Sequence, residues 1–266
     1  MLNNIFLKTL RDQRRSLLMW GAYLIVLGVI MALFYPTISK MTAFNQYLSQ
    51  LPEGMKEMFG TGIIDYTTPS GYFSTELFSL MVPLLLLVFG IGFGANTIAG
   101  EEEKGTLGFL LTNPVPRWRV VADKFSVLVV SIFVLGFLFW AGLAVTVSAM
   151  SINISILKLA EATIGACALA LVFAAVAFLA GCVKGSKGTS MGVASGLAVL
   201  TYLLNTLGGL VNWLKDYRFL SPFYHYMEPD TLNNGLSPVH LLVLLGLVII
   251  FFAFSIPAFI RRDIAR

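Results

Sequence analysis

The chain has 266 residues, of which 57% are hydrophobic and only 12% are charged. Soluble domains carry about a quarter charged residues, so this composition excludes a soluble globular protein. The net charge of +4 comes from basic residues that are spread over several segments, and without a single basic patch no nucleic-acid partner is expected.

Six mostly apolar stretches are long enough to cross a membrane, for which a helix needs about 20 residues. Lipid requires every backbone group to be paired within its own segment, which favours helices, and the period-two alternation of a membrane barrel is absent. The sequence predicts an all-α integral membrane protein, a single transmembrane domain over residues 1–266. The predicted spans are Leu17–Tyr35, Ser74–Ala99, Phe125–Met150, Leu157–Val183, Thr189–Val211 and Val239–Ile260.

The Lys and Arg residues predict how these spans are oriented. If both termini are cytoplasmic, the cytoplasmic segments hold 13 of the 18 basic residues and the outer segments hold 5. Cytoplasmic loops of membrane proteins carry an excess of Lys and Arg. We therefore expect a multi-pass protein of the cytoplasmic membrane with both termini in the cytoplasm.

Two segments outside the spans have amphipathic patterns. Residues 1–16 alternate apolar and basic residues at helical spacing, which predicts a helix lying in the lipid interface. Binding of a partner protein is the alternative for this helix. Residues 36–73 form the longest outer loop, where one or two short amphipathic helices could cap a substrate path or pack against the spans.

The second span carries several residues that are unusual in a membrane helix. Glu76 lies at its outer end, and an intramembrane carboxylate is a candidate for a substrate path. Pro83 removes a backbone hydrogen bond and predicts a kink. Close helix packing is predicted at Gly90, Gly92 and Gly94.

The break between the second and third spans runs from Gly100 to Lys124. Its acids suit the first turn of a helix, Gly105 then interrupts that helix, and a short apolar turn follows over residues 107–111. A solvated loop with anchoring charges is the alternative, but such a loop does not need the apolar turn.

This stretch resembles the type-2 ABC-transporter permeases, the membrane subunits of many bacterial ATP-driven exporters. The matching residues are Gly100-Glu-Glu-Glu-Lys-Gly-Thr-Leu107, then Leu110-Leu-Thr-Asn-Pro-Val-Pro-Arg117 and Lys124-Phe125. The family has six spans with both termini cytoplasmic, in agreement with the count above. The resemblance implies that residues 100–118 form a cytoplasmic coupling helix, which fits a groove in a separate ATPase subunit.

The resemblance also implies partners and roles. Two ATPase subunits would work with two permeases, which are either identical or sister proteins. Arg117 and Lys124 would brace the coupling segment at the lipid headgroups. The residues that dock to the ATPase would be Glu101, Glu102, Glu103, Gly105, Thr106 and Leu107.

The sequence offers no nucleotide, catalytic or metal site. A P-loop requires G-x-x-x-x-G-K-[ST], and the nearest approach, residues 181–189, has Ser186 in place of the second Gly. His225 and His240 are 15 residues apart with no Cys nearby. We expect no cofactor in this chain, because ATP and Mg²⁺ would bind to the partner ATPase.

The fifth span and the segment after it also carry distinctive patterns. Gly188, Gly192 and Gly196 recur at four-residue intervals, a spacing that lets helices approach closely. Since the resembled family pairs its permeases partly through spans one and five, we predict a dimer contact here, with packing inside one subunit as the alternative. Asn205 is the lone strongly polar residue in the outer half of this span and a second candidate for the substrate path. The aromatic-rich segment 212–238 resembles the re-entrant helices of that family.

Two functional interpretations remain. The first is the permease of an ABC exporter that moves a lipophilic or amphipathic cargo, such as an antibiotic, a peptide or a lipid, along a path between two subunits. The second is a secondary transporter or channel without an ATPase, which would need polar groups at mid-membrane, and those are nearly absent. We predict a transport subunit that is not itself an enzyme, with membrane lipid as its surroundings.

Overall fold

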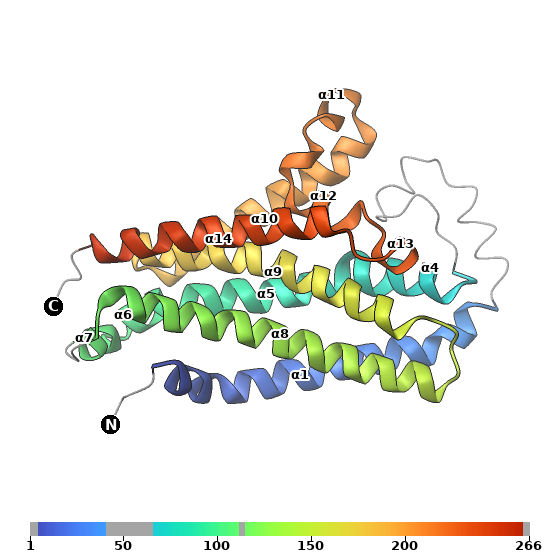
Figure 1. Ribbon diagram of the computed structural model, residues 1–266, viewed down its shortest axis with the longest axis horizontal. Helices are drawn as coiled ribbons and strands as arrows, with labels where there is room; N and C mark the ends of the chain where they lie inside the picture. Colours follow the sequence, from blue (N-terminus) through green and yellow to red (C-terminus); the bar gives the residue numbers. More distant parts are fainter. Residues whose placement is uncertain (1–4, 41–65, 112–114, 263–266) are drawn as a thin grey trace.

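A computed structural model describes residues 5–40, 66–111 and 115–262, and within these ranges the chain is all-helical (Figure 1). Six helical stretches are long and apolar enough to cross a membrane, so the prediction of six spans is confirmed. Five of these stretches are single helices: α1 (Ile5–Ile38), α8 (Arg117–Ala149), α9 (Ile156–Lys184), α10 (Lys187–Leu210) and α14 (Pro238–Ile260). The sixth, the second along the chain, is a composite stretch, Pro69–Glu103.

The helix α1 is longer than the predicted first span. Residues 5–16, which the sequence predicts to form a separate interfacial helix, are the first turns of the same uninterrupted helix. No Pro or Gly lies between Ile5 and Trp20, so nothing in the backbone ends the helix where its polarity changes. Most of the predicted outer loop 36–73, including residues 41–65, lies outside the described residues.

The composite second span contains two π-helices between three α-helical stretches. It runs through α4 (Pro69–Phe73), the π-helix η1 (Ser74–Met81), α5 (Val82–Ala95), the π-helix η2 (Asn96–Gly100) and α6 (Glu101–Glu103). In a π-helix each N–H bonds to the carbonyl five residues earlier, as the Val82 N–H does with Leu77. Pro83 has no N–H, so the Phe78 carbonyl lacks this bond and accepts one from the Tyr226 hydroxyl at 2.6 Å instead.

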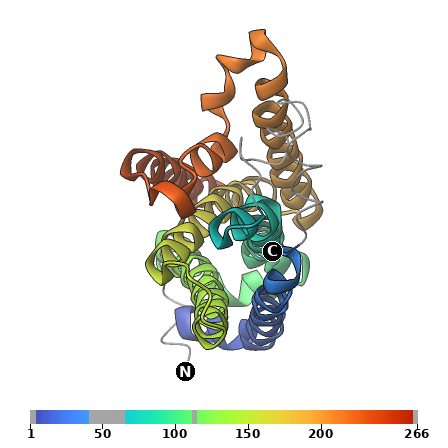
Figure 2. The same cartoon turned by 90° about the vertical axis from the view of Figure 1, so that its right-hand side faces the viewer.

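The helices α9 and α5 lie at the centre of the bundle, as the end-on view shows (Figure 2). The window of α9 that could span a membrane is 83% buried, more than that of any other span. Small residues make this packing possible. A Cβ on Gly94 would lie 2.5 Å from the Ala174 carbonyl oxygen, and one on Gly90 would lie 3.1 Å from the Ala174 Cβ. Gly92 differs from the prediction, since nothing lies within 4 Å of its Cβ position.

Short helices cap the two ends of the bundle. Both chain termini lie at the end that carries α6 and α7 (Thr106–Leu111), which we call the α7 end (Figure 1). The opposite end carries α13 (Thr231–Asn234), and we call it the α13 end. The predicted outer segment 212–238 contains α13 and three more short helices: α11 (Asn212–Lys215), the 3-10 helix η3 (Arg218–Leu220) and α12 (Pro222–Met227).

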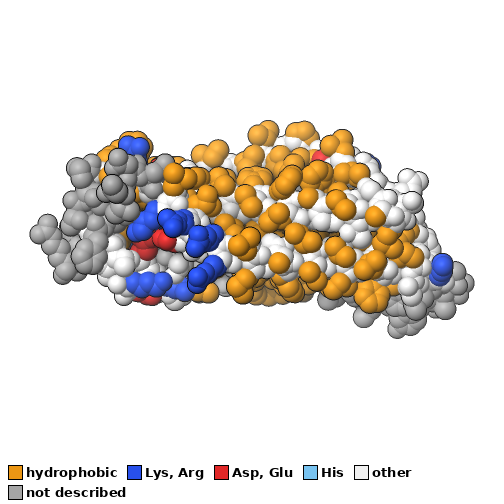
Figure 3. Space-filling view, turned by 90° about the horizontal axis from the view of Figure 1, so that it is seen from below, with side chains coloured by type: hydrophobic (Ala, Val, Ile, Leu, Met, Phe, Trp, Pro, Cys, Tyr) orange, Lys and Arg blue, Asp and Glu red, His pale blue; other side chains and the backbone are white. Residues whose placement is uncertain are grey.

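Charged and apolar side chains occupy different parts of the bundle surface. Seen from the side of α1, Lys and Arg gather at the α7 end, while hydrophobic side chains cover the middle (Figure 3). Large apolar residues of α1 and α8 are widely exposed, among them Leu18, Val145 and Phe137. Such a continuous apolar belt is expected of helices that face lipid.

Candidate functional site

The predicted coupling segment forms a helix, a sharp turn and a second short helix at the α7 end. Gly105 adopts a left-handed conformation with φ of +70°, which glycine accepts without strain, and this ends α6. The Thr106 hydroxyl donates to the Glu101 carbonyl at 3.1 Å and ties the start of α7 back to α6. Leu107 is 1% exposed and anchors α7 in the apolar core. The predicted break at Gly105 and the helical turn after it are confirmed.

The first acid of this segment forms an ion pair inside the bundle. The Lys124 Nζ lies 2.7 Å from a carboxylate oxygen of Glu101 and also donates to the Thr97 carbonyl at 2.8 Å. The Lys124 side chain is 1% exposed and that of Glu101 is 27% exposed. Lys124 therefore braces the segment, but from within the protein rather than at the lipid headgroups as predicted. The pair joins α6 to α8.

The second acid joins α6 to the ends of two other helices. Glu102 forms an ion pair with Arg262, which directly follows α14. The same guanidinium donates to the carbonyl oxygens of Gly181 and Cys182 at 3.3 and 3.2 Å, in the last turn of α9. Gly185, with φ of +63°, ends α9 beside this pair, and a Cβ there would lie 2.4 Å from the Glu102 carboxylate. Only glycine fits both the backbone conformation and the space.

The third acid binds the start of α10. A Glu103 carboxylate oxygen accepts a hydrogen bond from the Lys187 backbone N–H at 2.7 Å. Helix N-termini have unpaired N–H groups and a positive dipole end, so a carboxylate is favourable here. Ser186 caps the same helix through the Thr189 N–H. Glu101, Glu102 and Glu103, which we call the glutamate cluster, thus connect α6 to α8, α9, α10 and the end of α14.

Arg117 adds a further connection at the α7 end. Its guanidinium is exposed and donates to the carbonyl oxygens of Ile260 and Arg262, at 3.2 and 3.0 Å. Basic side chains stabilise the unpaired carbonyls at a helix C-terminus, here that of α14. Arg117 thus holds the start of α8 against the end of α14.

The predicted docking residues fall into two groups. The glutamate cluster bonds to this chain's own helices and Leu107 points into the core, whereas Gly105 and Thr106 are exposed. Sequence reasoning missed Arg262, the partner of Glu102. A pair of arginines after an apolar span is typical of a simple membrane anchor, and nothing local in the sequence indicates a distant acid.

The predicted dimer row lies on an open face of α10. Gly188, Gly192 and Gly196 are exposed, and no atom of the described residues lies within 4 Å of a Cβ built on any of them. The opposite face packs into the bundle through Ser190, Ala194 and Ala198. Close packing within the subunit therefore does not use this row, and the dimer contact stays a prediction.

A cavity of about 300 Å³ lies between α1, α5 and the start of α10. Gly92 lines it, which explains the open space at its Cβ position. One part of the wall is apolar and aromatic, with Trp20, Val88, Phe89 and Phe93. The other part is polar, with Gln13, Ser16, Asn96 and Lys187. A cavity with both kinds of wall suits an amphipathic molecule.

The two predicted path residues lie apart, at different places toward the α13 end. The Glu76 carboxylate, in η1, accepts a hydrogen bond from the Tyr66 hydroxyl at 2.9 Å. Burial raises the pKa of the Tyr66 hydroxyl, and the bond to Glu76 raises it further. Asn205 is 4% exposed, and its amide nitrogen contacts the Met227 sulfur at 3.3 Å while its amide oxygen has no hydrogen-bond partner in the described chain.

The structure brings the two histidines together, although the sequence gives them no joint role. The Nδ1 atoms of His225 and His240 lie 3.0 Å apart, and the His225 Nε2 lies 2.9 Å from the Phe219 carbonyl oxygen. Because a carbonyl only accepts, the His225 Nε2 is the donor and its Nδ1 accepts from His240. Within residues 5–40, 66–111 and 115–262, no group of three or more His, Cys, Asp or Glu residues could hold a metal ion.

One comparison with known proteins covers nearly the whole chain. A family model described as "ABC-2 family transporter protein" matches residues 3–264. None of the curated protein sequences compared with the chain matches it. The matched range includes all six spans and α7, which lies between the second and third.

Proposed function

Because the chain belongs to the ABC-2 family of transporter proteins, we propose that it is the permease subunit of an ATP-driven exporter in the cytoplasmic membrane. Membrane subunits of this family typically pair with separate ATPase subunits. Two ATPase subunits would dock at the α7 end, which then faces the cytoplasm together with both termini. The gathering of Lys and Arg at this end supports that orientation.

The observation that carries the proposal is the glutamate cluster. Three consecutive side chains connect one short helix to four of the six spans, through Lys124, Arg262 and the Lys187 N–H. Packed helices with fixed contacts move as rigid bodies, so a displacement of α6 is passed to the spans rather than absorbed by a loop. This arrangement suits an element that transmits the closure of an ATPase dimer.

The docking surface would then be the exposed turn beside the cluster. Lys104, Gly105, Thr106 and Gly108 are all exposed. The two glycines leave the backbone accessible, and the buried Leu107 fixes α7 against the bundle. We therefore propose two separate roles. Residues 104–108 contact the ATPase, and the glutamate cluster transmits the movement of the ATPase to the spans.

The cargo path would run along the groove that α1 and α10 form over α5. A second permease, identical or a sister protein, would pack its α10 near the glycine row and enclose the groove. The amphipathic cavity opens on this side of α5 and has room for part of a lipophilic molecule. An antibiotic, a lipopeptide or a lipid would each meet these requirements.

Co-purification with the ATPase encoded nearest to this chain tests the docking proposal. Glu102→Arg and Leu107→Asp are poor probes, because both side chains hold the protein's own fold together. Gly108→Arg changes an exposed residue with open space at its Cβ position instead, and Asn153→Arg in the α8–α9 turn at the opposite end is its matched control. We expect Gly108→Arg to lose the ATPase and Asn153→Arg to keep it. Retention by both variants would refute docking at this turn.

A second variant separates docking from transmission. Glu102→Gln removes the charge that pairs with Arg262 but leaves residues 104–108 unchanged. We expect it to retain the ATPase while cargo no longer stimulates ATP hydrolysis. Normal stimulation in this variant would contradict the role proposed for the glutamate cluster.

A further inference from the structure

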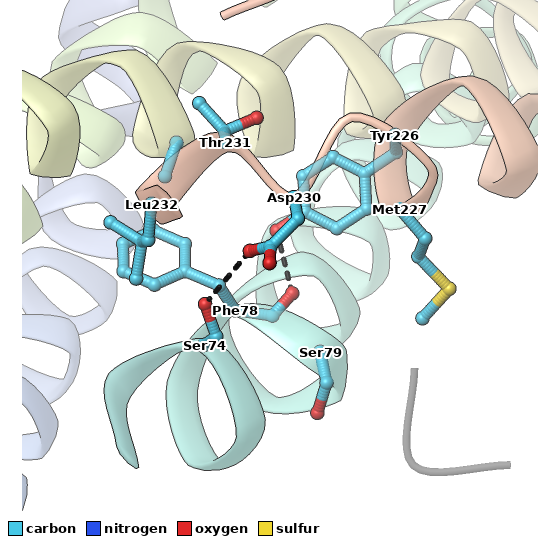
Figure 4. Close-up of a pocket in the computed structure, with 9 residues that line it drawn as sticks. Ser74, Phe78, Ser79, Tyr226, Met227, Asp230, Thr231 and Leu232 are labelled. Atoms are coloured by element: carbon cyan, nitrogen blue, oxygen red, sulfur yellow. Dashed lines mark hydrogen bonds between the residues drawn. The ribbon is translucent and has the colours of Figure 1, made fainter. Parts of the chain in front are cut away.

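A small pocket at the α13 end contains one carboxylate and several oxygen atoms. It has a volume of about 40 Å³ and lies between η1, α9, α12 and α13 (Figure 4). A water molecule needs roughly 10–15 Å³ of such volume, so the pocket holds a few small ligands. Its lining includes Ser74, Phe78, Tyr226 and Asp230, and no Lys or Arg of the described residues.

Asp230 is held in an unusual way. It is one of two non-glycine residues with positive φ in the described chain, at +43°, a conformation that costs about 1–2 kcal/mol. It occupies the N-cap position of α13, where an aspartate normally accepts from the helix N–H groups, but its side chain caps nothing. The carboxylate is directed across the pocket toward Ser74 (Figure 4).

The bonds that Asp230 makes to other described residues leave its negative charge unbalanced. Its two carboxylate oxygens accept from the Ser74 hydroxyl at 3.4 Å and from the Asn233 amide at 2.7 Å. A carboxylate has about four acceptor positions, so two remain. Neither of the two ion pairs in the described chain involves Asp230. The nearby Lys158 ammonium donates to the Asn233 carbonyl and does not line the pocket.

The π-helix supplies further oxygen atoms to the same pocket. The Phe78 carbonyl, which lacks its helical bond because of Pro83, accepts from Tyr226 and retains a second lone pair. Ser79 of the same π-helix also lines the pocket. Non-helical backbone at such a site is a common source of carbonyl ligands for cations in transporters. π-Helices themselves occur frequently at functional sites.

From this geometry we infer that the pocket of Asp230, Ser74 and Phe78 binds a small monovalent cation. Carboxylate, hydroxyl and carbonyl oxygens are the ligands that hard cations prefer, and one negative charge matches one positive charge. The cation is either an inorganic ion such as Na⁺ or the primary ammonium group of a molecule at the α13 end. In the second case the inference rests on the proposed exporter function and adds that the cargo is an amine.

Thermal unfolding of the purified permease in detergent tests the inference without the ATPase. The Tm is measured in NaCl, methylammonium chloride and choline chloride, each at about 0.1 M so that screening is equal. A ligand that binds only the folded state raises the Tm, and choline is too large for the pocket. We expect a higher Tm in NaCl or in methylammonium chloride than in choline chloride.

Asp230→Asn is the decisive variant, because asparagine keeps the shape and also tolerates the left-handed conformation. It should weaken cation binding by about tenfold or more, which corresponds to at least about 1.4 kcal/mol. In choline chloride it should be no less stable than the wild type. Glu228→Gln, an exposed acid two residues away, makes the same change of charge and should leave the cation response unchanged.

Each result has one meaning. A Tm increase in NaCl that Asp230→Asn abolishes supports an inorganic cation, whether or not methylammonium also raises the Tm, and an increase with methylammonium alone that this variant abolishes supports an amine. An absent increase, or an equal response in Asp230→Asn and the wild type, overturns the inference. Because the measurement omits the ATPase, a failed docking experiment leaves this result unaffected, and the reverse also holds.

Discussion

Removing the carboxylate of Glu101 should destabilise the protein more than removing the ammonium of Lys124. The variant Glu101→Ala leaves an ammonium that is 1% exposed with the Thr97 carbonyl as its remaining close partner. Breaking a buried pair in this way costs about 3–5 kcal/mol. Lys124→Met leaves a carboxylate that is 27% exposed, which water reaches, so its cost should be about 1–3 kcal/mol.

Reversible unfolding in mixed SDS micelles measures these differences. The double variant should cost less than the sum of the two single variants, with a coupling of about 2–3 kcal/mol, because neither charge is then left alone. Arg119→Met removes an exposed basic residue from the same helix and should change stability by less than about 0.5 kcal/mol. A cost of Lys124→Met that equals or exceeds that of Glu101→Ala, or strict additivity, would refute the burial argument.

Three further substitutions probe other parts of the fold. Gly185→Ala should destabilise by at least about 2 kcal/mol in the same assay, from left-handed strain and displacement of the Glu102 ion pair. Tyr226→Phe leaves the Phe78 carbonyl unpaired in a buried site and should cost about 1–3 kcal/mol by unfolding. His225→Gln should flatten the dependence of the Tm on pH between about pH 7 and 5, where histidine titrates.

The sign of the pH effect follows from the environment of His225. Burial lowers the pKa of His225, the bond to Phe219 opposes this, and His240 lowers it again. The unfolded chain therefore binds the proton more readily, so the stability is complete above the ordinary histidine pKa and is lost as the pH falls below it. A wild-type Tm that rises on acidification would contradict this sign.

For Gly185→Ala the control is Gly246→Ala. Its added Cβ meets open space, so this substitution should leave the stability nearly unchanged.

The sequence predicts the spans well because their signal is local. A run of about 20 apolar residues has few alternatives to a membrane helix. The turn at Gly105 is predictable for the same reason, since the residue is a glycine between two short helical patterns. Residues 5–16 show the limit of local reasoning. Their change of polarity suggests a separate element, but a helix ends only where its backbone is interrupted.

The partners of the glutamate cluster could not be predicted from the sequence. Glu102 and Arg262 are 160 residues apart, and their contact depends on the lengths and register of all the helices between them. The sequence therefore gives the charge of the segment but not the direction of its side chains. The π-helix η1 could not be predicted from the sequence either, because Pro83 predicts a disturbance of the helix without specifying its kind.

The acidic residues at the two ends of the bundle differ in their bonding partners. This difference distinguishes the acids that stabilise the fold from the acid that binds a ligand. At the α7 end each member of the glutamate cluster bonds to a Lys, an Arg or a helix N–H of the same chain. At the α13 end Asp230 has no such partner among the residues that the structure describes, and it occupies a strained conformation that does not cap its helix. An asparagine would keep both contacts without the charge, because its amide oxygen accepts from Asn233 while its NH₂ group donates to the Ser74 hydroxyl oxygen. A fold that needed only those bonds would therefore not need the carboxylate, which leaves a bound cation as the physical reason for it.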